Sequence, residues 1–137
     1  MNIVYTTNEL FVAKVAASIC SVFENNKEMK VIRVFIVGQG ISQNSKNKFV
    51  SMAKEYNRTI EIIPLNSLDE YIDFEFDTGG WNPIVLARLI LDKLLPTDVD
   101  KVLYLDGDTI NVASLSDLWN TDLEDKVLGG CIEATVN

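Results

Sequence analysis

The sequence predicts an α/β fold with a mainly parallel sheet flanked by helices. Short apolar runs alternate with segments of helical periodicity along most of the chain. Clusters rich in Gly, Asn, Ser or Pro separate these segments. Hydrophobic residues make up 47% of the 137 residues, which is enough for a sizeable core. This length suits a single domain, which we expect to span residues 1–137.

The first half of the chain alternates strands with helices. Asn8 can cap a helix whose apolar residues recur at helical spacing, and Ser42 can cap a second helix. Gly38 and Pro64 end the apolar runs that precede and follow this second helix. The expected elements are, in order, a strand at 2–6, a helix at 10–23, a strand at 31–37, a helix from Ser42 to about Tyr56 and a strand at 59–63.

The second half begins with a segment that we interpret as a loop. Residues 66–80 mix acidic with aromatic side chains and end in Thr78-Gly79-Gly80. Pro83 then suits the first turn of a strongly apolar helix, and Pro96 ends that helix. The expected elements of this half are a helix at 84–95, a fourth strand at 101–105, a turn of helix at 114–119 and a last strand at 126–132.

Charge and composition disfavour several classes of function. The net charge of −8 divides into +3 for residues 1–65 and −11 for residues 66–137. The second half therefore lacks the basic track that a nucleic acid needs. Because the sequence contains no histidine, this chain can supply neither an imidazole base nor a zinc-hydrolase site. Cys20 and Cys131 stand among apolar residues and are expected to be buried free thiols.

The sequence predicts no export signal and no transmembrane segment. Residues 1–10 lack the basic start and the cleavage site of a signal peptide. Lys14, Arg33 and Arg88 interrupt the apolar stretches, so none reaches the ~20 residues that a membrane-spanning helix requires. A cytoplasmic location is the resulting expectation.

Asp106-Gly107-Asp108 is the most informative motif. It follows the apolar run 102–105, at the carboxyl end of an expected strand, where open α/β sheets bind ligands. In an extended chain the two carboxylates would point the same way and repel each other. A divalent cation that also binds a phosphate removes this conflict, and Gly107 lets the backbone approach a ligand closely. The alternative is a pair of solvated aspartates in an ordinary turn.

Arg88 is a second candidate, because it lies on a largely apolar face of the expected helix and needs a partner. It can pair with Asp92 within that helix or extend its charged end into solvent. It can instead reach a diphosphate or one of the site aspartates. The sequence leaves both readings open.

A polar cluster, Thr6-Thr7-Asn8, follows the first expected strand, with Phe11 shortly after it. Its place at the carboxyl end of a strand puts the cluster on the predicted ligand-binding rim. Asn8 can read the edge of a base, and Phe11 can stack on it. The alternative is a helix cap with a core aromatic. Glu133, just past the last expected strand, means little alone.

Taken together, these segments resemble the start of a family 8 glycosyltransferase, of the lipopolysaccharide galactosyltransferase and glycogenin type. They keep the order and approximate spacing of that family across essentially the whole chain. The Asp-x-Asp block alone is moderately specific, whereas the ordered set is highly specific. The matching segments are Asn2–Asn8, Leu86–Leu89, Asp100–Asp108, Leu115–Trp119 and Gly130–Glu133.

The resemblance implies a fold of the nucleotide-diphospho-sugar transferase type (GT-A). It implies transfer of a hexose, glucose or galactose, from a UDP-sugar to a saccharide or glycolipid acceptor, with retention of anomeric configuration. Lipopolysaccharide biosynthesis is one such setting. Mn²⁺ or Mg²⁺ would assist by neutralising charge on the UDP leaving group, and oxygen ligands suit either ion.

The resemblance also assigns roles to residues near the diphosphate. Asp106 and Asp108 would bind the metal and, with Gly107, the diphosphate of the donor. Arg88 would contact the donor sugar or anchor the site. Glu133 falls where the family often has a shorter aspartate that faces the sugars. Arg88, Asp106 and Glu133 are therefore the candidate catalytic residues.

The nucleoside contacts implied by the resemblance come from the first strand and the turn after it. Thr6, Thr7 and Asn8 would contact uridine, and Phe11 would stack on uracil. Leu10 departs from the family, which has Asp or Asn there, because a leucine cannot hydrogen-bond a ribose.

The family's catalytic domains run well beyond 137 residues, and their later part supplies a metal-binding histidine and most acceptor contacts. We therefore expect this chain to be the N-terminal, donor-binding part, truncated relative to the family, and not to turn over alone. A truncated sheet would leave an exposed edge and apolar surface through which a homo-oligomer can form.

Two other functions fit part of the sequence. A non-catalytic nucleotide-sugar-binding or assembly module would use the same donor residues. A phosphatase of the haloacid dehalogenase type also places Asp-x-Asp after a strand, with Asp106 as nucleophile and Asp108 as acid/base. In that class the motif usually opens the fold, whereas here only 29 residues follow Asp108.

Overall fold

The computed structural model describes residues 1–71, 79–80 and 82–130. Its centre is a four-stranded parallel sheet with the order β3-β2-β1-β4. The strands are β1 (Asn2–Asn8), β2 (Arg33–Gln39), β3 (Thr59–Pro64) and β4 (Leu103–Tyr104). The helices are η1 (Glu9–Phe11), α1 (Val12–Asn25), α2 (Gln43–Glu55), η2 (Pro83–Ile90), α3 (Leu91–Leu94) and α4 (Ser116–Trp119), where η marks a 3₁₀ helix.

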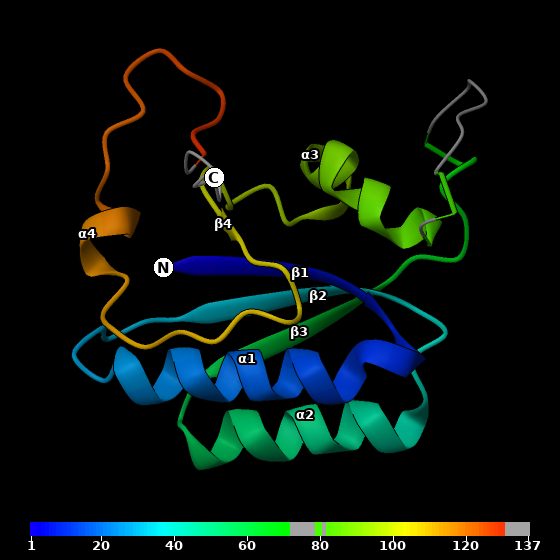
Figure 1. Ribbon diagram of the computed structural model, residues 1–137, viewed down its shortest axis with the longest axis horizontal. Coiled ribbons are helices and arrows are strands. Elements are labelled where there is room, and N and C mark those ends of the chain that lie inside the picture. Colours follow the sequence, from blue (N-terminus) through cyan, green and yellow to red (C-terminus); the bar gives the residue numbers. More distant parts are fainter. Residues whose placement is uncertain (72–78, 81, 131–137) are drawn as a thin grey trace, which may run out of the picture.

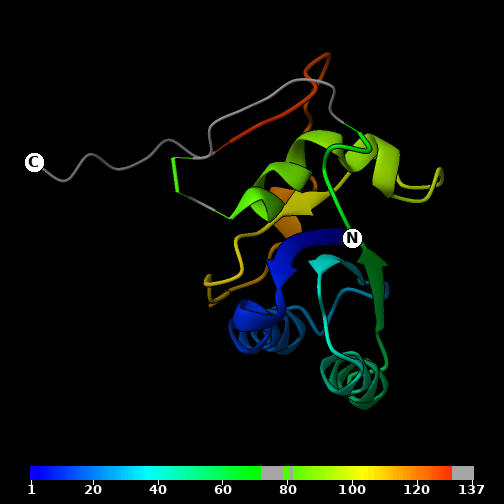
Figure 2. The ribbon, with the colours of Figure 1, turned by 90° about the vertical axis from the view of Figure 1, so that its right-hand side faces the viewer.

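The sheet lies between two helical layers, which confirms the predicted fold class. α1 and α2 cover one face, and η2 with α3 covers the other (Figures 1 and 2). The central strands are therefore apolar on both sides, as is usual for parallel sheets. In β1, Ile3 and Tyr5 pack into the core under α1, whereas Val4 packs into the core under η2.

The core under α1 and α2 follows from helical spacing in the sequence. Val15, Ile19 and Val22 recur on one side of α1 and are fully buried. Tyr5 lies beneath them, with its hydroxyl 2.9 Å from that of Ser18. Burial raises the pKa of the Tyr5 phenol to about 12, so this hydroxyl stays protonated.

Both predicted cap residues cap a helix, although Asn8 caps η1, which leads into α1, and not α1 itself. The Asn8 carboxamide oxygen accepts from the backbone N–H of Leu10 at 3.0 Å, and the Ser42 hydroxyl accepts from that of Ser45 at 3.2 Å. Glu9 links the two helix starts, because its carboxylate accepts from the Ser42 N–H and hydroxyl, each at 2.8 Å. The turn after β1 is thereby tied to the start of α2.

The predicted helix at 84–95 is wrong in type. Pro83–Ile90 forms a 3₁₀ helix, and only Leu91–Leu94 is α-helical. The residues that η2 buries are Ile84, Ala87 and Ile90, which are spaced by three. A 3₁₀ helix has three residues per turn, so this winding aligns all three side chains on the sheet.

The predicted last strand at 126–132 is not formed over its described part. Residues 126–130 are exposed and pair with no strand. A strand needs a neighbour for its backbone groups, but this segment leaves the sheet beyond α4 (Figure 1). Val127 is completely exposed and Leu128 is 78% exposed. Residues 131 and 132 of the predicted strand lie outside the described residues.

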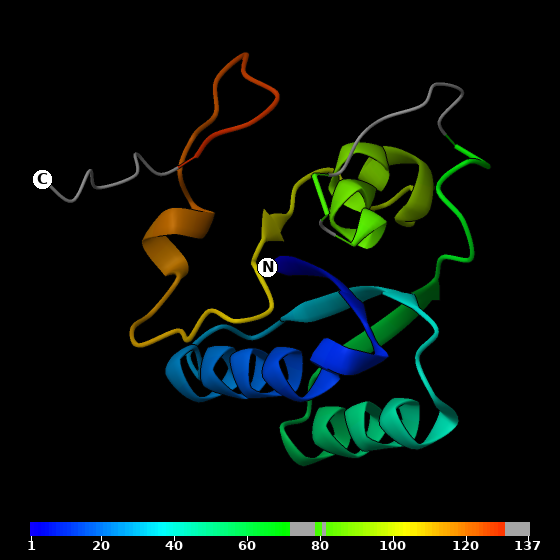
Figure 3. The same cartoon turned by 45° about the vertical axis from the view of Figure 1, so that its right-hand side comes forward.

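A polar seam joins the segment after β4 to α1. This segment turns back and runs along α1 (Figure 3). Asn111 donates its backbone N–H to the Ser21 hydroxyl at 2.9 Å, and Leu115 donates its N–H to the Asn26 side chain at 2.6 Å. The seam fixes the return path of the chain from the carboxyl end of β4.

Within the described ranges 1–71, 79–80 and 82–130, no helix combines the length and the apolar character needed to cross a membrane. The predicted loop at 66–80 is consistent with the structure over 66–71, which contain neither helix nor strand. Residues 72–78 of that loop lie outside the described part.

Candidate functional site

The candidate site lies where the strand order of the sheet reverses. β2 and β3 follow β1 on one side, whereas β4 returns to pair with β1 on the other side. Ligands of open α/β sheets bind at such a reversal, beyond the carboxyl ends of the strands. Two of the predicted clusters meet there, namely the polar residues that end β1 and the aspartates that follow β4.

The carboxyl end of β1 presents alternate side chains to this site. Thr6 and Asn8 are both partly exposed, and the Thr6 hydroxyl lies 2.7 Å from that of Tyr104. Thr7 points to the opposite face, is 2% exposed, and donates its hydroxyl to the Asn8 carbonyl at 3.2 Å. The side chain of Thr7 therefore does not join those of Thr6 and Asn8 on the rim.

Phe11 is an accessible aromatic rather than a core residue. Its side chain is 45% exposed, and the Lys14 ammonium lies 4.5 Å from the centre of its ring. Asn8 serves as the cap of η1 with one side-chain oxygen, which leaves its amide NH₂ as a further donor. Phe11 thus offers an accessible aromatic ring, and Asn8 offers a further hydrogen-bond donor. Leu10, 88% exposed, lies between them in sequence.

Asp106, Gly107 and Asp108 do not continue the strand. Thr109 donates both its N–H (3.1 Å) and its hydroxyl (2.7 Å) to the Asp106 carbonyl, closing a turn with Gly107 and Asp108 at its centre. The sequence predicted an extended chain that aligns the two carboxylates. That expectation is wrong, because the chain turns at these residues. Pairing with β1 ends near Leu105, whose N–H donates to Val4, and the chain then turns. Both aspartates are exposed at this turn.

Gly107 sets how closely the turn approaches α1. A Cβ added to it would lie 2.7 Å from Cγ2 of the fully buried Val15. Contacts that short do not occur between carbon atoms, so only glycine fits without displacement. The reason for glycine at this position is thus close packing against α1, in addition to any close approach of a ligand.

Arg88 reaches the aspartate motif. Its guanidinium lies 3.5 Å from Oδ1 of Asp106, its Nε donates to the Val85 carbonyl at 2.8 Å, and its Cζ lies 4.5 Å from the centre of the Tyr104 ring. Arg88 thus contacts Asp106, and its side chain, 41% exposed, also reaches solvent.

Tyr104 is the residue of this site that the sequence did not predict. It connects β1 with η2 through its hydrogen bond to Thr6 and the cation above its ring. Burial raises the pKa of its phenol, with the nearby Asp106 charge acting in the same direction. Its place depends on the pairing of β4 with β1, which sets Tyr104 beside Val4 and puts its side chain on the face of Thr6.

The turn carries two exposed carboxylates, which by themselves are an incomplete set of ligands for a hard divalent cation. Asp106 and Asp108 supply carboxylate oxygens, which suit Mn²⁺ and Mg²⁺. Among the described residues, no group of three or more His, Cys, Asp or Glu side chains is gathered closely enough to bind a metal. Such an ion would complete its shell with water and with phosphate oxygens of a ligand.

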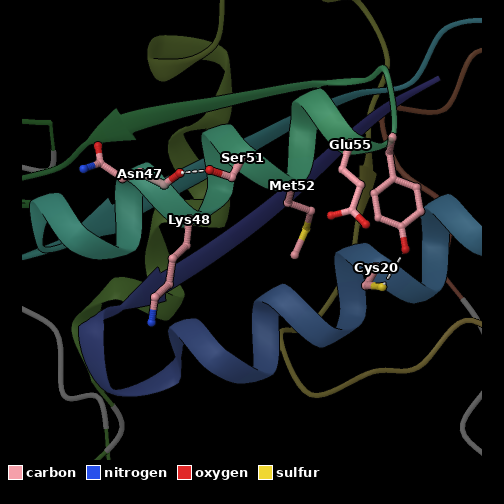
Figure 4. A pocket seen from close by; sticks show the side chains of 7 residues that line it. Cys20, Asn47, Lys48, Ser51, Met52 and Glu55 are labelled. Atoms are coloured by element: carbon pink, nitrogen blue, oxygen red, sulfur yellow. Dashed lines mark hydrogen bonds between the residues drawn. The ribbon is translucent and has the colours of Figure 1, made fainter.

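Hollows also lie away from this turn among the described residues. A hollow of about 470 Å³ lies between α1 and α2, and Figure 4 shows the side chains around it. Within it, the Cys20 thiol lies 3.1 Å from the Tyr56 hydroxyl. Cys20 is a free thiol that is partly exposed, whereas the sequence predicted a buried one. A smaller hollow of about 200 Å³ lies beyond β2 and β3, lined by Gln39, Leu65, Asn66, Ser67, Leu68, Asp69, Pro83 and Ile84.

Glu133 and Cys131 lie outside the described residues. The roles predicted for Glu133 and for the other candidate site residues stay predictions. The structure brings together Thr6, Arg88 and Asp106 around Tyr104, and Asn8 ends the strand that carries Thr6.

The family whose sequence model matches this chain is glycosyl transferase family 8, and the match spans residues 2–137. The chain belongs to glycosyltransferase family 8. This membership confirms the resemblance seen in the sequence, and it contradicts the phosphatase alternative. A putative glycosyltransferase of Haemophilus influenzae is 27% identical over 137 residues, which are 100% of this chain and 40% of that protein.

Solved structures of family 8 proteins share the fold. The galactosyltransferase LgtC, in complex with donor and acceptor sugar analogs, is 30% identical with a TM-score of 0.78, over 91% of this chain and 44% of LgtC. An active-site mutant of LgtC gives a TM-score of 0.83 at 30% identity, over 97% of this chain and 46% of that one. The chain thus spans less than half the length of these family 8 relatives.

A shorter similarity is found to a plant protein. A probable galacturonosyltransferase-like protein of Arabidopsis thaliana is 37% identical over 46 residues, which are 34% of this chain and 13% of that protein.

The likeness to LgtC confirms the predicted GT-A-type architecture, since it covers nearly all of this chain.

Proposed function

We propose that this family 8 chain binds a UDP-sugar with Mn²⁺ or Mg²⁺ and serves the transfer of a hexose to a saccharide or glycolipid acceptor. The observation that carries the proposal is the meeting of Thr6, Arg88 and Asp106 around Tyr104, at the reversal of the strand order. That place combines groups for a nucleoside with groups for a metal-bound diphosphate. We propose residues 1–137 as one nucleotide-sugar-binding domain.

Each side chain has a role that its surroundings support. Asn8 and Thr6, both partly exposed, would hydrogen-bond uridine, and the exposed Phe11 ring would stack on uracil. Because the Thr7 side chain is buried, Thr7 would act by fixing the backbone between Thr6 and Asn8. The names of the relatives favour a hexose or its uronic acid as the transferred sugar, since they are a galactosyltransferase and a galacturonosyltransferase-like protein.

Asp106 and Asp108 would hold the cation, and Gly107 would let the diphosphate approach the turn. When bound, the cation supplies Lewis-acid stabilisation of the charge that develops on UDP. Arg88 adds a second positive charge beside Asp106, which favours the anionic leaving group and the donor sugar's hydroxyls. Retention of anomeric configuration and a role for Glu133 belong to the same proposal.

A second candidate is binding of the donor without turnover. The observation that favours it is that the chain spans 40% to 46% of its longer relatives, so acceptor contacts can reside in the parts of those relatives that the match does not cover. Multiple-turnover transfer of sugar to a saccharide acceptor by the 137-residue chain would rule this candidate out.

Calorimetric titration of the chain with UDP, with and without Mn²⁺, tests the proposal. We expect Mn²⁺-dependent binding that Asp106→Asn with Asp108→Asn abolishes. Asp100→Asn with Asp117→Asn is the matched control, because it removes the same charge from exposed positions before β4 and in α4, away from the carboxyl ends of the strands. Unchanged Mn²⁺-dependent affinity in the first double mutant would contradict the assignment.

A further inference from the structure

The Tyr104 side chain lies at the junction of the elements that build the site. Its hydroxyl is 2.7 Å from that of Thr6 on β1, and its ring faces the Arg88 guanidinium from η2, with Cζ 4.5 Å from the ring centre. A guanidinium within about 6 Å of an aromatic face is attracted to it. The Tyr104 ring therefore attracts the Arg88 guanidinium, and the hydrogen bond to Thr6 holds the ring in position.

The contact between Arg88 and Asp106 is correspondingly loose. A tight arginine–carboxylate pair makes two parallel hydrogen bonds of about 2.7–2.9 Å, whereas here one nitrogen lies 3.5 Å from Oδ1. Arg88 spends another donor, Nε, on the Val85 carbonyl at 2.8 Å. The Asp106 side chain remains 60% exposed, so its oxygens are accessible.

We infer that Tyr104 is a positioning residue. It keeps the Arg88 guanidinium near Asp106 but prevents it from forming a close pair with two hydrogen bonds to that carboxylate. Without the ring, the guanidinium is free to form the two-pronged pair with Asp106, and that pair competes with a cation for the same oxygens. With the ring, Arg88 stays near enough to meet a diphosphate while Asp106 remains open to the metal. This inference rests on the proposed metal and donor site.

The test uses the 137-residue chain and Mn²⁺ alone. Paramagnetic broadening of the Gly107 amide signal reports on cation binding between Asp106 and Asp108, and it does not require UDP or turnover. In Tyr104→Leu we expect the Mn²⁺ midpoint to rise by roughly threefold, the scale of an exposed ion pair. Tyr104→Phe keeps the ring but loses the hydroxyl that bonds Thr6, so its midpoint should rise less than that of Tyr104→Leu.

Removal of Arg88 separates positioning from a general loss of structure. Adding Arg88→Met to Tyr104→Leu should bring the Mn²⁺ midpoint back to the wild-type value or below, because no guanidinium remains to occupy Asp106. A merely structural role of Tyr104 predicts no such recovery. An unchanged midpoint in Tyr104→Leu, or an equal rise with and without Arg88, would overturn the inference.

A readout that needs no metal distinguishes this inference from the proposed function. The ring should shift the Arg88 Nε–H proton signal upfield in the wild type and in Tyr104→Phe, but not in Tyr104→Leu. If Mn²⁺ leaves Gly107 sharp in the wild type, the proposed metal site is wrong, and the Arg88 signal still decides whether Tyr104 holds Arg88. An unshifted Arg88 signal in the folded wild type would overturn the inference whatever the metal does.

Discussion

Gly107 packs against Val15 so closely that a methyl group on Gly107 would lie 2.7 Å from Cγ2 of Val15. Val15 is fully buried under the sheet, so it has little room to give way. The turn that carries Asp106 and Asp108 therefore packs closely against α1. A change in the packing of α1 at Val15 would therefore also move the turn that carries Asp106 and Asp108.

Gly107→Ala should therefore displace the turn. We expect a loss of about 1–3 kcal/mol in the free energy of unfolding, the usual cost of overpacking, measured by urea denaturation. Mn²⁺-dependent UDP binding should weaken as well, because the aspartates move with the turn.

The matched control for this change is Gly130→Ala, since nothing lies within 4 Å of a Cβ built there. It should alter stability by less than about 0.5 kcal/mol. Equal stabilities of the two variants would show that the turn adapts without cost.

Asn26 anchors the polar seam behind the aspartate turn. It is fully buried, donates to the Val22 carbonyl (2.8 Å) and the Asn111 side chain (2.9 Å), and accepts from the Leu115 N–H (2.6 Å). Asn26→Ala leaves these groups unpaired and should cost about 2 kcal/mol of stability. Hydrogen exchange should quicken at Asn111, reporting a loosened segment after β4.

Asn25→Ala is the matched control for the seam. The Asn25 side chain is exposed and donates to the Ser21 and Asn111 carbonyls. Water can replace these bonds, so the loss should stay below about 1 kcal/mol. A larger loss in Asn25→Ala than in Asn26→Ala would contradict the anchoring role of Asn26.

Local sequence signals predicted those features that depend on neighbours in the chain. Asn8 and Ser42 cap their helices as predicted, because a cap is formed with an N–H two or three residues away. The parallel sheet followed from apolar runs between helical segments. The end of the apolar run 102–105 correctly predicted that the aspartates follow the carboxyl end of β4.

Features that depend on distant contacts were not predictable in this way. The turn at Asp106 is closed by Thr109 and packed on Val15, a contact across most of the chain. Tyr104 acquires its role only through Thr6 and Arg88, which other elements supply. The 3₁₀ winding of η2 depends on how it meets the sheet, and periodicity over so short a segment does not fix it.

Glu9 should make stability depend on pH in the acid range. Hydrogen bonds from the backbone and hydroxyl of Ser42, and from the Ser45 hydroxyl, lower the pKa of Glu9 below its ordinary value of 4.5. A lowered pKa in the folded state stabilises the protein above pH 4.5, and this contribution disappears as pH falls through the folded-state pKa. Glu9→Gln should therefore be less stable than the wild type at neutral pH, with the difference shrinking below pH 4.5.

Urea unfolding between pH 3 and pH 7 measures this difference for Glu9→Gln. Glu61→Gln is its matched control, since it removes the same charge from an exposed glutamate on β3, away from the helix starts. A stability difference in Glu9→Gln that is constant across the range would exclude the capping carboxylate as its origin.

Asn8 has two roles to separate, the observed cap and the proposed uridine contact. Serine caps helices about as well as asparagine, so Asn8→Ser should cost only a few tenths of a kcal/mol, whereas Asn8→Ala should cost about 1 kcal/mol. Both variants lose the amide NH₂. If that group donates to uracil, both should bind UDP with roughly threefold to tenfold lower affinity in calorimetry, the scale of one hydrogen bond. Wild-type affinity for UDP in the well-folded Asn8→Ser variant would leave Asn8 as a helix cap alone.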